Sequence, residues 1–86
     1  MEGELSPQQD AVYQRLRKVA SRLWDRDEAD LTLDFDVFNQ VDVVDSLDMV
    51  ELVTVMESEL GVRLGDDEIR GVRTLRDLVL LISSRM

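Results

Sequence analysis

The chain has 86 residues and a mass of 9.9 kDa, which suits one small domain and is too little for two. With 19 Asp and Glu against 10 Lys and Arg, its net charge of -9 repels nucleic acid and anionic membranes and favours basic partner surfaces. The chain has no Cys and no His, which excludes disulfides, thiolate chemistry and histidine bases or metal ligands. We therefore expect one domain over residues 1–86 that binds no nucleic acid and catalyses no reaction by itself.

The two ends of the sequence lack the patterns of targeting and membrane segments. Residues 1–4 are acidic where a signal peptide is basic, and the apolar run Leu78–Ile82 is far too short to span a membrane. We expect a cytoplasmic protein without membrane insertion, with residues 1–5 disordered. Nothing in the sequence demands more than a monomer.

A first helix is predicted from about Pro7 to Trp24. Ser6 is a suitable N-cap, Pro7 occupies a position where its missing N–H costs nothing, and Gln9 closes a capping box. The helix should bury a stripe of apolar residues at helical spacing, namely Val12, Leu16, Val19, Ala20 and Leu23. Its outer face carries four basic residues, Arg15, Arg17, Lys18 and Arg22, which we interpret as a solvated face.

Residues 25–44 show no helical period. Residues 31–37 alternate between apolar and polar, as a strand does, but a lone strand has nothing to pair with in this chain. We prefer a long ordered loop whose apolar side chains pack onto the helices, namely Leu31, Leu33, Phe35 and Phe38. A loop of this length is unusual and often functional.

A second helix is predicted to begin with Asp45 or Ser46 as its N-cap. It should end near Gly61, because glycine readily adopts the left-handed conformation that closes a helix. Five apolar residues at helical spacing form its buried stripe, namely Met49, Leu52, Val53, Met56 and Leu60.

Two shorter helical segments complete the chain. A third helical turn is expected around Asp66 to Arg70. Thr74 and Asp77 then cap a last helix whose buried stripe is Leu75, Leu78, Val79 and Ile82. The predicted fold class is therefore all-α.

Acidic residues are concentrated in the middle of the chain. Between Arg26 and Arg63 there is no basic residue and there are eleven acidic ones. Asp48, Glu51 and Glu57 can form one acidic ridge beside the core stripe, which serves either partner binding or solubility. The Asp spacing does not fit a calcium-binding loop, and no metal site is expected.

Ser46 lies at the predicted start of the second helix. Unpaired backbone N–H groups and the helix dipole at such a position can accommodate a phosphate attached to the hydroxyl. A serine at the same position is also a common N-cap, so the position alone leaves both interpretations open.

The segment Asp45–Val53 resembles the phosphopantetheine attachment motif of acyl carrier proteins. Residues 59–64, 66–68 and 72–75 follow with the order and spacing of that family's third and fourth helices, so the resemblance covers most of the chain. It implies a four-helix bundle with a long first loop and a short third helix. It also implies that Ser46 is esterified by 4′-phosphopantetheine, which a phosphopantetheinyl transferase donates from coenzyme A. The reactive thiol then belongs to this group, which accounts for the missing Cys and His.

The resemblance also implies roles for other residues. Asp45 and Leu47 flank the attachment point. Acyl-loading and acyl-processing enzymes with basic docking surfaces would contact Asp48, Val50, Glu51, Thr54, Glu57, Asp66, Asp67 and Glu68. A bound acyl chain would be sheltered by Val53, Leu64, Ile69 and Val72.

The chain departs from the fatty-acid carriers at three positions. Val43 stands where these carriers have Gly, Gly65 replaces a common Pro, and Ile69 replaces an alanine-like residue. These changes favour a discrete carrier of a specialised biosynthetic pathway over one of primary fatty-acid synthesis. The alternatives are an aminoacyl or peptidyl carrier, such as a D-alanyl carrier, and an unmodified acidic helical adaptor in which Ser46 is only a cap.

Overall fold

In the computed structural model, which describes residues 5–37 and 46–86, helix α1 spans Pro7–Trp24 and begins with the predicted capping box. The Ser6 hydroxyl accepts a hydrogen bond from the Gln9 N–H at 3.1 Å, and Gln9 Oε1 accepts one from the Ser6 N–H at 2.9 Å. These bonds satisfy two backbone donors that the first turn of a helix leaves without partners. Leu5, inside the stretch predicted to be disordered, is half-buried and packs against the core.

The buried face of α1 differs from the predicted stripe at its end. Val12, Leu16 and Ala20 are buried as expected, and Val19 is half-buried. The prediction for Leu23 was wrong, because its side chain is 36% exposed and Trp24 is buried in its place. A spacing of four residues advances the buried face by about 40° at each step, so the stripe reaches Trp24, which stacks on Phe35 with ring centroids 6.1 Å apart.

Residues 25–37 form an ordered connection that packs on α1, as predicted. It contains one short 3-10 helix, η1 (Glu28–Asp30), which the sequence did not indicate. The Tyr13 hydroxyl donates to the Leu31 carbonyl at 2.7 Å and ties the connection to α1. Leu31 and Phe35 are buried and Leu33 is half-buried, whereas Phe38 lies outside the described residues.

The alternating pattern of residues 31–37 has a structural basis in a short pairing with the segment before the last helix. Asp36 and Thr74 form an isolated antiparallel bridge. The Val37 N–H donates to the Arg73 carbonyl at 2.8 Å, and the Leu75 N–H donates to the Phe35 carbonyl at 3.1 Å. Val37 is buried as a result, although the sequence interpretation did not include it in the core.

Helices α2 (Ser46–Leu60) and α3 (Asp66–Arg70) begin and end within the predicted limits. Gly61 has a φ of 68° and closes α2, with its N–H bonded to the Glu57 carbonyl at 2.9 Å. The stripe of α2 is buried at Met49, Leu52, Val53 and Met56 and half-buried at Leu60.

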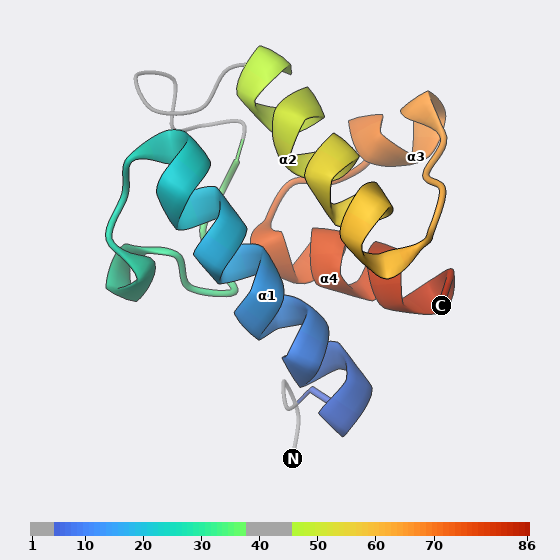
Figure 1. Ribbon diagram of the computed structural model, residues 1–86, viewed down its shortest axis with the longest axis horizontal. Helices are drawn as coiled ribbons and strands as arrows, with labels where there is room; N and C mark the ends of the chain where they lie inside the picture. The colour runs from blue at the N-terminus through green and yellow to red at the C-terminus, as the bar shows by residue number, and fades with distance from the viewer. Residues whose placement is uncertain (1–4, 38–45) are drawn as a thin grey trace.

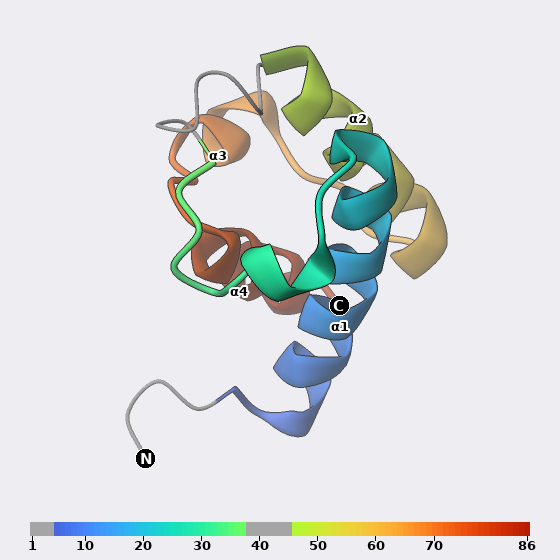
Figure 2. The ribbon, with the colours of Figure 1, turned by 90° about the vertical axis from the view of Figure 1, so that its left-hand side faces the viewer.

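Helix α4 (Leu75–Ser84) completes the predicted all-α bundle of four helices. Thr74 and Asp77 form its capping box, and all four residues of its predicted stripe are buried. Helix α1 packs against both α2 and α4. In Figure 1, α2 lies between α1 and α3, and Figure 2 shows α1 and α2 on one side of the molecule and α3 and α4 on the other. Buried residues of α1, α2 and α4 belong to one core. Within the described ranges, no helix is both long and apolar enough to cross a membrane.

Candidate functional site

The N-terminal end of α2 is the centre of the candidate site, because Ser46 is the first residue of the helix and Leu47 the second. Asp45, the predicted neighbour of the attachment point, lies outside the described residues. The first turn is anchored on the core: Met49 is buried, and Trp24 Nε1 donates to the Asp48 carbonyl at 3.4 Å. The backbone at the start of α2 therefore has a fixed position relative to α1.

The exposed face of α2 continues from this end along the helix. Val50, one turn beyond Ser46, is 55% exposed, and Glu51 and Thr54 are also exposed. The Thr54 hydroxyl donates a hydrogen bond to the Val50 carbonyl at 2.8 Å, so the hydroxyl proton already has an acceptor within the helix. This face combines an exposed apolar side chain with carboxylates, as expected of a surface that meets apolar and basic groups of a partner.

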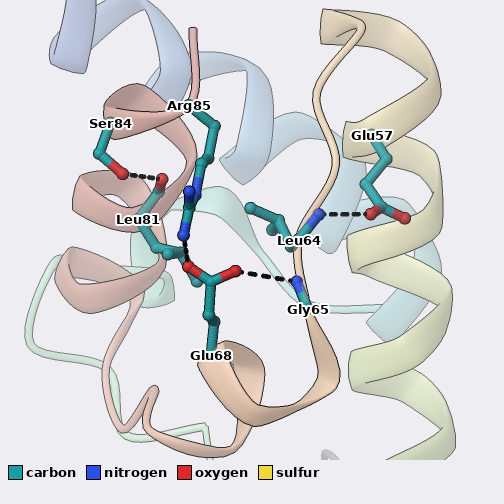
Figure 3. Close-up of polar contacts among 7 residues, drawn as sticks. All are labelled: Glu57, Leu64, Gly65, Glu68, Leu81, Ser84 and Arg85. Carbon is teal, nitrogen blue, oxygen red and sulfur yellow. Dashed lines mark hydrogen bonds and ion pairs between the residues drawn. The ribbon is translucent and has the colours of Figure 1, made fainter.

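Glu57 differs from the other acidic residues of α2, because it is half-buried and bonded to the backbone. Its Oε2 accepts a hydrogen bond from the Leu64 N–H at 2.8 Å. The bond joins the last turns of α2 to the loop of residues 61–65 that leads to α3 (Figure 3). Glu57 therefore has a structural contact in addition to its predicted role toward partners.

The three acids of α3 are arranged in two ways. Asp66 and Asp67 are exposed, and Asp67 lies 3.5 Å from the Arg70 guanidinium one turn later. Glu68 is half-buried, and its Oε1 accepts from the Gly65 N–H at 3.1 Å, while Oε2 pairs with Arg85. Only Asp66 and Asp67 present their carboxylates mainly to solvent, and Glu68 connects the start of α3 to the end of α4.

The residues predicted to shelter an acyl chain come from α2, from the loop 61–65, from α3 and from the segment that follows α3. Val53, Leu64 and Val72 are buried and belong to the core, and Ile69 is half-buried beside it. A surface depression of about 290 Å³ lies elsewhere, on the outer side of the C-terminal half of α2. It is lined by Thr54, Glu57, Ser58, Val62 and Arg63 and includes none of the predicted chain-sheltering residues.

The basic face of α1 is partly engaged in contacts within the protein. Arg15 lies 3.2 Å from Glu59 of α2, and Arg17 donates to the Glu28 carbonyl at 2.9 Å. Lys18 and Arg22 are exposed, as expected of a solvated face. Within residues 5–37 and 46–86, no group of three or more acidic side chains is arranged to hold a metal ion.

Sequence reasoning missed the contacts that connect the loop, α3 and α4. The spacing of Gly65 and Glu68 is that of an N-cap and its N3 residue, which is a usable local signal for the bond between them. The pairing of Arg85 with Glu68 and the bond from Leu64 to Glu57 have no such signal. They join residues that become neighbours only when the helices pack.

Comparison with known proteins shows which family the chain is similar to. The family described as "Phosphopantetheine attachment site" matches residues 14–82, which include Ser46, the loop and α3. An acyl carrier protein of Petrotoga mobilis is 30% identical over 77 residues, 90% of this chain and 89% of the relative. Acyl carrier protein 2 of Pseudomonas aeruginosa is 34% identical over 70 residues, 81% of this chain and 87% of the relative. An acyl carrier protein of Rickettsia typhi is 29% identical over 85 residues, 99% of this chain and 98% of the relative.

The helical fold and the matched residues define a phosphopantetheine-binding carrier domain. The chain belongs to the acyl carrier protein family. The attachment domain of these proteins carries a 4′-phosphopantetheine prosthetic group. Members of the family are carriers, not catalysts, and they act together with partner enzymes.

Proposed function

We propose that this chain carries an acyl intermediate as a thioester on a 4′-phosphopantetheine group esterified to Ser46. The observation that carries the proposal is the position of Ser46 as the first residue of α2, inside the region matched to the attachment-site family. The first-turn N–H groups of a helix have no intrahelical partner, and the helix dipole favours negative charge there. The residues present therefore fit a phosphodiester at this position.

The group supplies a terminal thiol for the thioester, and the protein supplies its attachment and presentation. The Ser46 hydroxyl would lose its proton and form a phosphoester bond with the phosphopantetheine moiety, as the pyrophosphate bond of coenzyme A breaks and adenosine 3′,5′-bisphosphate leaves. Asp45 and Leu47 are the neighbours of Ser46 in the sequence, and the buried Met49 and Trp24 pack the first turn of α2 against the core. The absence of Cys and His from the chain agrees with a role in which partner enzymes perform the chemistry.

The proposed docking surface for these enzymes runs along α2 and onto α3. Its members are exposed or half-buried, namely Asp48, Val50, Glu51, Thr54, Glu57, Asp66, Asp67 and Glu68. Their carboxylates would steer partners with basic surfaces, the phosphopantetheinyl transferase among them. Val53, Leu64, Ile69 and Val72 would shelter an acyl chain where the inner side of α2 meets the loop and α3.

The remaining features of the proposal concern the chain as a whole. Residues 1–86 would act as one carrier domain and as a monomer, in the cytoplasm, where coenzyme A and the loading enzymes are found. An acyl cargo is proposed over an aminoacyl one because the named relatives are acyl carrier proteins.

The proposal is tested by intact mass before and after incubation of the unmodified protein with coenzyme A and a promiscuous phosphopantetheinyl transferase. We expect the wild type to gain the mass of one phosphopantetheine and Ser46→Ala to gain none. Ser58→Ala is the matched control, because Ser58 is an exposed serine of the same helix, and it should be modified like the wild type. Ser46 is the first residue of α2, so its replacement should cost no more stability than the loss of a cap, about 1 kcal/mol, and both variants should remain folded. Modification of Ser46→Ala, or none of the folded wild type, would contradict the proposal.

A further inference from the structure

Two consecutive backbone amides at the end of the loop 61–65 are held by carboxylates from the helices on either side. The Leu64 N–H donates to Glu57 of α2 at 2.8 Å, and the Gly65 N–H donates to Glu68 of α3 at 3.1 Å. Figure 3 shows the two carboxylates reaching the loop from opposite sides. Hydrogen bonds to an ionised acceptor are stronger than neutral ones, so this pair fixes the loop where it enters α3.

These two contacts matter because only one apolar side chain of α3, the half-buried Ile69, packs against the core. Helix α3 has five residues, all within the described part of the chain, and none of them is buried. Gly65 at its N-cap offers no side-chain cap. The loop itself contributes Val62 and Leu64 to the core, so the position of the buried Leu64 side chain is coupled to the bond that its own N–H makes.

Glu68 also accepts an arginine. Its second oxygen pairs with the Arg85 guanidinium from beyond the end of α4. The Arg85 side chain is 46% exposed and the Glu68 side chain 32% exposed, so this carboxylate accepts a guanidinium at a place open to solvent. Glu57 lines the surface depression beside the loop and is reachable in the same way.

We infer that Glu57 and Glu68 are positioning residues whose carboxylates are shared between the loop and a basic partner, so that docking of arginine side chains weakens their hold on Leu64 and Gly65. A bidentate guanidinium takes both oxygens of a carboxylate in one plane and competes with the backbone N–H for them. The inference rests on the proposed function for the nature of the partner, an enzyme with a basic docking surface. Docking would then loosen the loop that carries Leu64, one of the residues proposed to shelter the acyl chain.

The inference is tested by amide hydrogen exchange in the full-length Ser46→Ala variant, which cannot carry the group on that residue. A hexa-arginine peptide serves as the cationic probe at low salt. We expect severalfold faster exchange at the Leu64 and Gly65 amides, no change at the buried amides of α1 and α4, and reversal at high salt. Bound peptide with unchanged or slower exchange at these two amides would overturn the inference. Failure of the peptide to bind at low salt would also overturn it, because the two carboxylates must be open to cations.

Two substitutions on α2 distinguish the positioning role of Glu57 from the effect of removing any negative charge from the helix. Glu57→Gln keeps a neutral acceptor for the Leu64 N–H but loses the charge that attracts arginine. We expect the peptide to accelerate exchange at Leu64 much less in this variant than in its parent. The matched control is Glu59→Gln, which removes an exposed charge of the same helix outside the proposed docking surface and should leave the peptide's effect on Leu64 intact. Equal effects in the two variants would contradict the specific role of Glu57.

Gly65→Pro releases Glu68 from the loop without removing its charge. Gly65 has a φ of -78°, which proline adopts, and a Cβ there would lie 3.3 Å from Glu68 Oε1, a movable side-chain end. Coupling between two sites is reciprocal, so a carboxylate no longer held by the loop should bind arginine more tightly. We expect severalfold tighter peptide binding than in Gly65→Ala, which keeps the N–H. Equal affinities would contradict the inference, and the outcome is independent of whether Ser46 is modified.

Discussion

Helices α3 and α4 follow one another and both have an acidic N3 residue, yet different forces hold them. Thr74 at the start of α4 accepts a hydrogen bond from Asp77, and the helix buries four apolar side chains. Gly65 at the start of α3 has no side-chain cap, and none of the five α3 residues, all of them described, is buried. Helix α4 is thus fixed mainly by the core, whereas α3, in which only Ile69 packs against the core, is fixed mainly by contacts of charged side chains.

Because of this difference, we expect the two helices to have different roles in a carrier. A helix fixed by buried side chains keeps its place whatever approaches the surface, because disturbing it exposes apolar area. A helix fixed by carboxylates responds to cations and to salt. We therefore expect α4 to maintain the fold and α3 to respond to a basic partner.

The largest expected effect is on stability and comes from the core side of α4. Leu78→Ala should lower the free energy of unfolding by about 2–5 kcal/mol, because Leu78 is fully buried and its truncation leaves a cavity. Leu80→Ala on the same helix is the control, since Leu80 is 42% exposed and should cost far less. Urea denaturation followed by circular dichroism measures both variants. Similar losses would show that α4 is not fixed by its buried face.

The next largest effect distinguishes the start of α4 from the start of α3. Thr74→Ala should cost about 1 kcal/mol of global stability, because it removes the hydroxyl that caps a core helix. Glu68→Ala should change the urea midpoint less and instead speed exchange at the Gly65 amide, because α3 has no fully buried side chain and contributes only the half-buried Ile69 to the core. A larger loss of global stability in Glu68→Ala than in Thr74→Ala would reverse the comparison.

The smallest effect is kinetic and depends on salt. Asp67→Lys should slow modification by the transferase severalfold at low salt, because Asp67 is exposed on the proposed docking surface. Asp77→Asn on α4 should leave the rate nearly unchanged, because this carboxylate accepts from the Arg73 and Thr74 N–H groups and serves the cap. Rates measured across a salt series test both expectations. An Asp67→Lys rate equal to the wild type at low salt would remove α3 from partner recognition.

The sequence predicted those features that depend on residues close together in the chain. The capping boxes at Ser6 and Thr74, the left-handed Gly61 and the limits of all four helices follow from local hydrogen bonding and helical spacing. The burial of Trp24 in place of Leu23 did not follow, because it depends on the Phe35 ring that only the packed connection brings into contact.

The contacts of the candidate site were harder to predict than its residue types. The family resemblance predicted Ser46 as the attachment point and an acidic surface for partners, and the family assignment itself is confirmed by the matches to known carriers. The hydrogen bond from Leu64 to Glu57 spans seven residues across a turn, and the pairing of Arg85 with Glu68 joins two helices. Such contacts depend on how the helices pack, which residue spacing alone does not determine.

Ser46 is the proposed attachment point, and mapping the modified residue tests this proposal most directly. Trypsin cleaves after Arg and Lys, and because no basic residue lies between Arg26 and Arg63, digestion yields one fragment of residues 27–63 that contains Ser46. After incubation with coenzyme A and the transferase, tandem mass spectrometry of this fragment should place the added phosphopantetheine on Ser46. Its placement on Ser58, on a threonine, or on a different fragment would contradict the claim.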